Sequence, residues 1–552
     1  MPPPLNQDEA SRGYDAWCLL ETGADRYGAR WPFFLKSFGP GDYTAALTTY
    51  LTVAFVAWLG PTPTAMRLPD ALLGVATVLL LYLWLRRQFN EQVALLAAGV
   101  LAVDPWHIAL CRTAHESGFT PFFLVLSLLA LNRAGLLPAE EAHLQPETSE
   151  RLERHRSSWG FAAGFALAMH TWAYPATRLF TPLFCLAIVF IYGRWYQAAF
   201  RARRLRRAMI AGVAGLVVGA TPLWWTALTH PEHLAARARA TLLIYRDSSV
   251  TEMAGQFLAN YAAELHPRYW YLQADEMSGP AIPDVGQHLL IMAPLWFIGF
   301  IIILTRLRRC RWSRLLSAWL LLYPIPAAIC WGWNPHIMRT VSGIILFPII
   351  AAIGGQWILA RLAARPKWLR HSLESLMLLA LLANVSHFND AYFRRFLPFA
   401  ESGYQTSLVQ AFDYVSRHKN DADFVLVTIW ANQPYIYALL QEPIPPAELA
   451  KSPPVVCRGP DGFDQVLAVG RYLFTPRYTA DYPEVEARFQ NLLSSLPPGS
   501  RGLVIDLLNP PEGEPPNAPI VYETPAARGI VTRHNKKSYV VRRWSLPGPV
   551  AR

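Results

Sequence analysis

Apolar segments long enough to cross a lipid bilayer dominate roughly the first 390 residues of the chain. A bilayer-spanning helix needs about 20 mostly apolar residues, and fewer when its ends snorkel to the interface. The segments that meet this requirement are Leu68–Leu85, Val93–Leu110, Phe119–Leu131, Gly160–Tyr174, Leu179–Tyr192, Met209–Leu228, Gly286–Leu304, Leu315–Trp331, Val341–Leu359 and Leu373–His387. The sequence therefore predicts a polytopic α-helical membrane protein with about ten transmembrane helices.

The low charge content fits a protein whose helices face lipid. Only 16% of the 552 residues are charged, whereas about 25% is usual in soluble proteins. The net charge of +11 is spread over short arginine-rich runs between the apolar segments. Nucleic-acid binding needs the charge gathered on one soluble face, so we expect no nucleic-acid partner. The six cysteines are scattered and give neither a disulfide framework nor a zinc site.

Basic residues between the apolar segments indicate which loops face the cytoplasm. Four loops, at 86–87, 194–207, 306–314 and 361–370, hold 17 basic residues against one nearby acid, Glu91. Cytoplasmic loops carry such a bias, so we place these four loops inside the cell. By parity the opposite loops face outward. They are Cys111–Gly118, Pro175–Arg178, Thr229–Val285 and Gly332–Arg339, followed by everything after about Phe388.

The segment Tyr43–Leu59 is apolar enough to be a further span, but we predict that it lies in the membrane interface. Threonines recur every four residues from Thr44 to Thr52 and would place hydroxyl groups along one helical stripe. Such a stripe suits an interfacial helix, although an ordinary span that tolerates threonines is the alternative. The interfacial placement leaves the acidic pair Asp8-Glu9 outside. We expect a first transmembrane helix before this pair to be missing from the reading frame.

These assignments divide the chain into three parts. Residues 1–67 form a first extracytoplasmic loop with the acidic pair and the interfacial helix. Residues 68–388 form the transmembrane core, which includes a long outer loop at 229–285. Residues 389–552 form a small extracytoplasmic α/β domain, because their apolar runs are short and separated by prolines. Its expected helices are Ser407–His418 and Tyr482–Leu496, and its expected strands are Phe424–Ile429, Gly502–Leu507 and Ser538–Trp544.

Ionisable and polar side chains gather at the predicted outer surface, where charge is costly unless it is used. They are Asp8, Glu9, Arg112, His115, Glu116, Tyr174, Arg178, His336 and Arg339. A carboxylate of the Asp8-Glu9 pair is a candidate base for an acceptor hydroxyl. The other seven residues are candidates for binding a lipid phosphate, since arginine donors match its oxygens. A divalent cation on Glu9 and Glu116 would also suit the phosphate, but the chemistry does not require one.

Each candidate also has a structural interpretation. Arg112 and Glu116 are four residues apart and would form a salt bridge on one helical face. Arg178 would snorkel to the membrane surface. His170, inside an apolar segment, is expected to be a buried structural histidine. The Asp-Glu dipeptide is common, so it indicates a catalytic site only in combination with the outer-loop residues.

Three stretches of the sequence together resemble the GT-C class of membrane glycosyltransferases. They are NQDEASRGYDAWCLLETGADRYGARWPFF, RLPDALLG and DPWHIALCRTAHES. The chain is most similar to bacterial relatives of the protein O-mannosyltransferases and of the transferase that adds aminoarabinose to lipid A. The resemblance covers roughly residues 4–390. It implies transfer of a sugar, with inversion, from a polyprenyl monophosphate carrier to an acceptor outside the cytoplasmic membrane.

The resemblance also implies roles for particular residues. The pair Asp8-Glu9 matches the acidic pair of the family, with the aspartate as base. Arg112 and Glu116 match an arginine and a glutamate of the second outer loop, and Arg339 matches a late arginine that holds phosphate.

The chain departs from the family pattern in two places. Family members have a transmembrane helix before their acidic pair, which this chain lacks. The lipid A enzymes have a Glu-Lys pair where this chain has Leu35-Lys36, so that carboxylate metal ligand is absent here.

We therefore predict a glycosyltransferase of the cell membrane that uses a polyprenyl-phosphate sugar. The acceptor is a protein, a glycolipid or a polysaccharide. The alternative is a transporter or flippase of lipid-linked saccharides, which would need polar groups along its transport path. A receptor or assembly factor built around the C-terminal domain is a third interpretation.

Overall fold

The computed structural model describes residues 3–138, 150–201, 205–273, 282, 284–332, 334–396, 401–428, 432–458, 463–476, 483–507, 519–523 and 539–546. The chain divides into two compact units. Met1–Met66 and Arg395–Arg552 together form one, which we call the terminal unit. Arg67–Arg394 form the other, which we call the helical unit.

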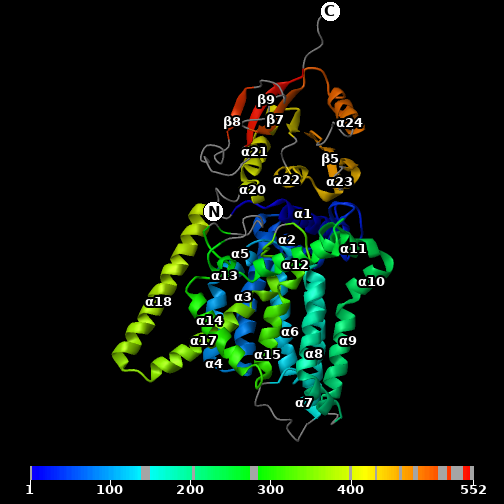
Figure 1. Cartoon of the computed structure of the whole chain (residues 1–552). Helices are drawn as coiled ribbons and strands as arrows, with labels where there is room; N and C mark the ends of the chain where they lie inside the picture. Colours follow the sequence, from blue (N-terminus) through cyan, green and yellow to red (C-terminus); the bar gives the residue numbers. More distant parts are fainter. Residues whose placement is uncertain are drawn as a thin grey trace, which may run out of the picture. The chain divides into compact units, whose positions relative to one another are not determined.

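The helical unit consists of helices, and most of the long ones run side by side (Figure 1). Its elements are α3 Pro63–Gln88, α4 Glu91–Ala102, α5 Pro105–Cys111, η1 Glu116–Phe119, α6 Thr120–Arg133, α7 Glu150–Ala173, α8 Thr177–Arg201, α9 Arg206–Gly219, α10 Thr221–Thr229, α11 Pro231–Thr241, η2 Leu243–Tyr245, α12 Val250–Glu264, α13 Pro267–Tyr271, α14 Met292–Arg306, α15 Arg311–Leu322, α16 Ile325–Ala328, η3 Val341–Gly343, α17 Leu346–Ala363 and α18 Lys367–Asp390. A π-helical segment, Ala391–Arg395, continues α18.

Three helices of the described chain are long and apolar enough to cross a membrane, namely α3, α8 and the continuous stretch Val341–Ala363. The pair α4 and α5, bent by 58°, and the pair α9 and α10, bent by 47°, bring the number to five if each pair is one span. These five coincide with predicted segments. The expected helical architecture is confirmed, whereas the count of ten spans remains a prediction.

The threonine stripe predicted for Tyr43–Leu59 begins later than expected. Thr44 lies in strand β2, Asp42–Ala45, which pairs antiparallel with β1, Phe34–Gly39. Helix α2 covers only Leu47–Leu59, and Thr48 and Thr52 are buried along it. Its 13 residues span about 20 Å, which is less than the hydrocarbon core of a bilayer. The inclusion of Thr44 in a helix was wrong, because the β1–β2 pairing takes that residue.

Helices α7 and α9 pack with their backbones in contact. A Cβ atom on Gly164 would lie 1.9 Å from the carbonyl oxygen of Gly212, and one on Gly215 would lie 2.1 Å from that of Phe161. Only glycine fits at such positions, as in the small-residue interfaces of membrane helices. The glycines of α7 and α9 therefore set the distance between these two helices.

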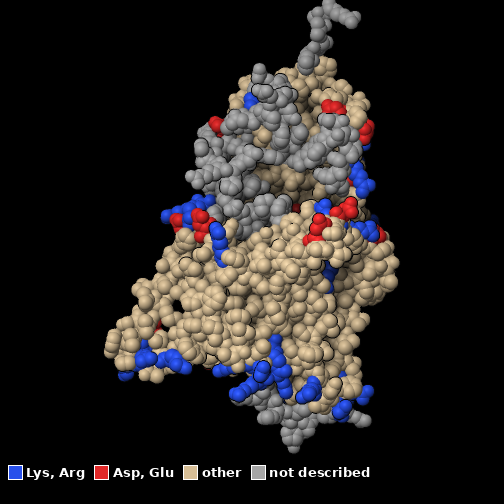
Figure 2. Space-filling model, in the orientation of Figure 1, with Lys and Arg blue, Asp and Glu red and all other residues tan. Residues whose placement is uncertain are grey.

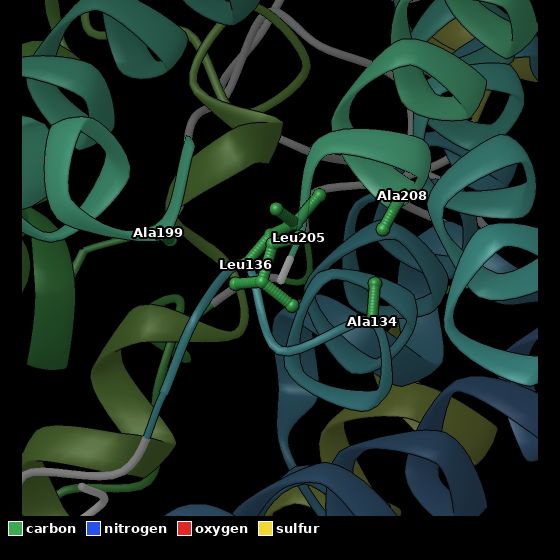
Figure 3. Close-up of a cluster of buried hydrophobic side chains, with 5 residues drawn as sticks. All are labelled: Ala134, Leu136, Ala199, Leu205 and Ala208. Atoms are coloured by element: carbon green, nitrogen blue, oxygen red, sulfur yellow. The ribbon is translucent and has the colours of Figure 1, made fainter. Parts of the chain in front are cut away.

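A small cluster of buried side chains lies at the start of α9. Figure 3 shows Ala134 and Leu136, which follow α6, facing Leu205 and Ala208 at the start of α9. Ala199 of α8 completes the cluster. Side chains from α8, from the start of α9 and from the residues after α6 therefore pack in one apolar cluster.

Basic side chains gather at one end of the helical unit. Figure 2 shows Lys and Arg in blue over the lower end of this unit in that view. The last turns of α3, α14 and α17 each carry arginine. This gathering agrees with the loops that the charge bias assigns to the cytoplasm, and the sidedness itself stays a prediction.

The C-terminal part of the terminal unit is an α/β domain. Its seven-stranded sheet has the order β4-β5-β6-β3-β7-β9-β8, with β3 parallel to β6 and β7. The strands are β3 Phe424–Val427, β4 Val455–Arg458, β5 Asp464–Val469, β6 Tyr472–Phe474, β7 Arg501–Leu507, β8 Ile520–Glu523 and β9 Tyr539–Ser545. The helices are α20 Glu401–Tyr404, α21 Thr406–Arg417, α22 Tyr435–Gln441, α23 Pro446–Lys451 and α24 Pro483–Ser494, with a 3-10 turn at Lys419–Asp421.

The predicted elements of this domain all have counterparts. The two expected helices correspond to α21 and α24, and the three expected strands to β3, β7 and β9. Three end residues of expected elements, Ile429, Tyr482 and Ser538, lie outside the described residues. The strands β4, β5, β6 and β8 were not anticipated.

The N-terminal segment of the terminal unit packs on the C-terminal domain. Its first helix, α1, covers Gln7–Thr22. The hydroxyl group of Tyr14 donates a 2.7 Å hydrogen bond to the carbonyl oxygen of Ile444. Lys36 of β1 forms an ion pair with Asp464 of β5. The two segments that the sequence suggests as separate parts therefore form one compact unit.

Replacing Gly164 by leucine tests the contact between α7 and α9. We expect the Gly164→Leu protein to lose about 2 kcal/mol or more of stability, because the side chain must push the two backbones apart. Gly193→Leu is the matched control, since a Cβ atom there meets nothing within 4 Å. Thermal unfolding in detergent measures the difference, and equal melting temperatures for the two variants would show that the contact is not tight.

Candidate functional site

The acidic pair Asp8-Glu9 lies in the first turn of α1, and its two carboxylates have different surroundings. The side chain of Asn6 accepts a 2.8 Å hydrogen bond from the Glu9 N–H, and Glu9 Oε2 accepts a 2.9 Å bond from the Asn6 N–H. This reciprocal arrangement is a capping box, which satisfies two donors at the helix start. Glu9 is fully buried, whereas Asp8 is half-buried and takes no part in the box. The geometry makes Glu9 a helix-capping residue and leaves Asp8 as the carboxylate available for chemistry.

A buried ion pair holds the end of the segment that carries this motif. Arg26 pairs with Asp15 of α1, and both side chains are 2% exposed. The Arg26 guanidinium also donates to the carbonyl oxygen of Ser37 in β1. Removing one partner of a buried pair typically costs about 3–5 kcal/mol. The pair therefore fixes α1 against β1 firmly.

In the helical unit, a short loop between α5 and η1 carries three predicted site residues. Arg112 is the C-cap residue of α5, His115 is the N-cap residue of η1, and Glu116 is the first residue of η1. The Nδ1 atom of His115 accepts a 3.2 Å hydrogen bond from the Ser117 N–H, which leaves Nε2 as the protonated nitrogen of a neutral ring. His115 therefore has a clear structural role in shaping this loop.

Close packing fixes the loop on α3. A Cβ atom on Gly118 would lie 2.2 Å from a carboxylate oxygen of Asp70, a residue of α3 that is only 2% exposed. The start of α5 is anchored as well, because Asp104 Oδ1 accepts from the His107 N–H at 3.2 Å and Asp104 Oδ2 lies 2.6 Å from His288 Nδ1. Buried carboxylates thus lie at the start of α5 and beside Gly118 of η1.

Aromatic rings support the guanidinium of Arg112. Its Cζ atom lies 4.9 Å from the ring centre of Tyr392 and 5.5 Å from that of Phe393. A guanidinium over ring faces gains cation–π stabilisation while its N–H donors can still bind another group. The rings orient Arg112 without using up its donors.

Glu116, Tyr174 and Arg178 come together from separate segments. Tyr174 follows α7 and is buried, with its ring edge-on to His115 at 5.8 Å between centres. Burial and the negative charge of Glu116 together raise the pKa of Tyr174 to about 12. Glu116 also interacts electrostatically with Arg178, at the start of α8. The i,i+4 salt bridge with Arg112 is not what holds Glu116, because α5 ends at Cys111 and the two residues share no helix.

Two further arginines interact electrostatically with Tyr174. Arg339, just before η3, and Arg237 of α11 both oppose the rise in the pKa of Tyr174. The Nη1 atom of Arg339 is buried, and it has no hydrogen-bond partner among the residues that the structure describes. An anionic ligand such as a phosphate could accept a hydrogen bond from this Nη1 atom. Arg237 was not anticipated, because nothing in the sequence distinguishes it from the other arginines of its loop.

The loop with His336 is tied to α12 by a buried carboxylate that sequence reasoning missed. The His336 N–H donates a 2.7 Å hydrogen bond to Glu264 Oε1, and Glu264 is fully buried. The backbone oxygen of Glu264 accepts from Trp270 Nε1 at 2.8 Å. An acid at the C-terminal end of a helix opposes the helix dipole, which is the signal that could have identified it.

An apolar groove between α3 and the α4–α5 pair ends at Arg112. Its volume is about 770 Å³. Its lining consists of Ala71, Gly74, Val75, Val78, Leu79, Tyr82, Leu95, Ala98, Gly99, Ala102, His107, Ile108, Cys111 and Arg112. Most of these side chains are small or aliphatic, and Arg112 provides the cation at one end. We call this feature the α3–α4 groove.

Comparisons with known proteins agree with this geometry. Residues 44–137 match the sequence model of the dolichyl-phosphate-mannose-protein mannosyltransferase family. That stretch contains the whole lining of the α3–α4 groove and the loop with Arg112, His115 and Glu116. The fold is similar to the crystal structure of ArnT from Cupriavidus metallidurans bound to undecaprenyl phosphate, with a TM-score of 0.55, 12% identity and coverage of 99% of this chain and 96% of that chain. The resemblance to the GT-C membrane glycosyltransferases is confirmed.

Two Bacillus subtilis (strain 168) proteins, each named "Putative mannosyltransferase", share short stretches with the chain. YkcB is 39% identical over 67 residues, which is 12% of this chain and 9% of YkcB. YycA is 30% identical over 106 residues, which is 18% of this chain and 16% of YycA. The matches thus span less than a fifth of either relative.

Glu264 offers a direct test of how this site is held. Glu264→Ala leaves the buried His336 N–H without its acceptor, which costs about 1–3 kcal/mol. Glu264→Gln keeps an oxygen in that place, so we expect it to retain most of the stability. Thermal unfolding of both variants measures this, and an equal loss in both would show that charge rather than the hydrogen bond holds the loop.

Proposed function

We propose that this chain transfers a sugar, with inversion, from a polyprenyl-phosphate carrier to an acceptor on the outer side of the cytoplasmic membrane. The observation that carries the proposal is the α3–α4 groove, which joins an apolar wall to the guanidinium of Arg112. A polyprenyl phosphate has the same two parts, an apolar chain and an anionic head. The fold likeness to ArnT, whose crystal structure holds undecaprenyl phosphate, supports this occupant.

The arginines bind the phosphate of the donor. Arg112 presents its donors at the end of the groove, and Arg178 and Arg339 lie around Glu116 and Tyr174. Guanidinium groups match phosphate oxygens with paired N–H donors, and they stabilise the negative charge that the leaving phosphate gains. Glu116 and Tyr174 position these arginines rather than react. His115 and His336 hold the loops that carry them.

Asp8 acts as the general base. It takes the proton of the acceptor hydroxyl while that oxygen attacks the anomeric carbon of the sugar. The bond between this carbon and the phosphate oxygen breaks, and its electron pair leaves with the polyprenyl phosphate. One attack from the opposite face inverts the anomeric centre. No general acid is needed, because the phosphate is a good leaving group.

The carboxylates first considered for a metal do not fit one well. Glu9 is fully buried and engaged in the capping box. Glu116 already interacts with the arginine Arg178. Among the described residues, neither belongs to a set of three converging His, Cys, Asp or Glu side chains. The proposed reaction therefore assigns no step to a metal ion on these two carboxylates.

Replacing Asp8 tests the chemical step. We expect Asp8→Asn to abolish transfer while protein level, membrane insertion and melting temperature stay as in the unchanged protein, because Asp8 is outside the capping box. Glu9→Gln is the matched control, since glutamine also closes a capping box and should retain transfer. Mass spectrometry of glycans and glycolipids from cells with each variant gives the readout. Transfer by Asp8→Asn would remove the proposed base, and lipid movement without any transfer would favour a flippase.

Filling the groove tests the donor site separately. A Cβ atom on Gly99 meets nothing within 4 Å, so Gly99→Leu projects into the α3–α4 groove without a clash. We expect it to weaken undecaprenyl phosphate binding at least about tenfold, which corresponds to about 1.4 kcal/mol. Gly193→Leu, outside the groove, should bind normally. Binding measured with undecaprenyl phosphate and with undecaprenol separates the headgroup from the tail, and normal binding by Gly99→Leu would contradict the assignment.

A further inference from the structure

Two histidines and a glutamate converge where α10 meets α11. His230 is both the C-cap residue of α10 and the N-cap residue of α11. Glu232 and His233 lie in the first turn of α11. A ligand atom from each of the three side chains lies within 4.8 Å of the other two. His230 and Glu232 are well exposed, whereas the side chain of His233 is 21% exposed. The cluster belongs to the helical unit, and none of its three residues is assigned a step in the proposed reaction.

The distances within the cluster suit a divalent cation. Glu232 Oε1 lies 3.4 Å from His230 Nδ1 and 3.6 Å from His233 Nε2. Zinc binds imidazole nitrogen and carboxylate oxygen at about 2.0–2.2 Å in tetrahedral sites, which separates neighbouring ligand atoms by about 3.3 Å. The distances from the carboxylate oxygen to the two nitrogens are thus close to the separation of two ligand atoms on one zinc ion. The exposure of His230 and Glu232 leaves room for water as a fourth ligand.

The ordinary alternative is a capped helix start in which Glu232 attracts protonated histidines. The imidazole rings of His230 and His233 stack almost in parallel, with centres 4.9 Å apart and an interplanar angle of 11°. Two positively charged rings repel each other in that arrangement, whereas two neutral rings on one cation do not. The N-terminal end of the α11 dipole opposes a cation, and the negative charge of Glu232 offsets this effect.

We propose that His230, Glu232 and His233 bind a zinc ion with three protein ligands. Imidazole with a carboxylate is a ligand set that zinc accepts readily. The ion ties His230, the residue between α10 and α11, to the first turn of α11. Arg237 lies one to two turns further along α11 and acts on Tyr174. Zinc therefore helps to position Arg237 relative to Tyr174. An effect on sugar transfer rests on the proposed function, whereas zinc binding itself does not.

The test uses the full chain in detergent, purified with a tag that contains no histidine. Titration with Zn²⁺ by calorimetry should show one saturable site, and Co²⁺ should give the absorption of a tetrahedral ion. We expect His230→Ala and His233→Ala each to weaken binding by at least 10–100-fold, because even indirect partners of zinc ligands have effects of that size. His371→Ala is the matched control. His371 lies 3.4 Å from Glu374 and is exposed, but it belongs to no group of three ligands among the described residues.

The outcomes separate the possibilities. Loss of the site in both cluster variants, with full binding by His371→Ala, supports the proposal. An absence of saturable binding in the unchanged protein overturns it, as does binding that survives both substitutions. A rise in melting temperature with Zn²⁺ only in the proteins that keep the cluster would show that the ion stabilises the α10–α11 joint. If zinc binds but sugar transfer is unaffected by its removal, the site stands and its link to Arg237 is wrong.

Discussion

Charge buried among apolar helices has to be compensated, and this constraint organises the candidate site. Glu116 is only 5% exposed, and its charge is balanced by Arg178 from another helix. Tyr174 lies under the influence of both Glu116 and Arg339. An isolated charge in such surroundings is expensive, so each of these residues needs the others. The result is a set of arginines held in place before any ligand arrives, which is the preorganisation that binding a phosphate requires.

Small residues serve two opposite purposes in the helical unit. In α7 and α9, glycines such as Gly164 let two backbones touch, and any side chain there would collide with a carbonyl group. Along α3 and α4, small residues such as Gly99 face open space and leave the α3–α4 groove unfilled. The same residue type thus removes space between one pair of helices and creates space between another. Composition alone cannot tell the two uses apart, because the difference lies in what faces each glycine.

The sequence predicts the helices of this protein better than it predicts the site. Apolar length is a local property, so the spans at α3 and α8 could be identified directly. The role of Glu9 was also visible, because Asn6 and Glu9 have the spacing of a capping box, but the acidic pair was interpreted as one catalytic unit. Glu264 and Arg237 were missed, since their importance comes from partners far away in the sequence. The strands β4 to β6 were missed although β5, with six residues, is longer than the predicted β3 with four.

The zinc cluster was missed for a related reason. His230, Glu232 and His233 lie within four consecutive residues, and the sequence-based prediction of metal ligands named Glu9 and Glu116 instead. Three ligand atoms converge only because α10 ends and α11 begins within the same few residues. On a continuous helix His230 and His233, three residues apart, would share a face, but Glu232 would point to another side.

The C-terminal domain is not an independent module, because the terminal unit also includes the N-terminal segment Met1–Met66. A domain that follows a membrane core can be pictured as an independent module for acceptor recognition. Here Tyr14 and Lys36 from the N-terminal segment bond to Ile444 and Asp464 of that domain. Deleting the domain would therefore also remove the support of α1, the helix that begins with Asp8. Loss of transfer after such a deletion would not identify an acceptor-binding role, because the proposed base would have lost its scaffold at the same time.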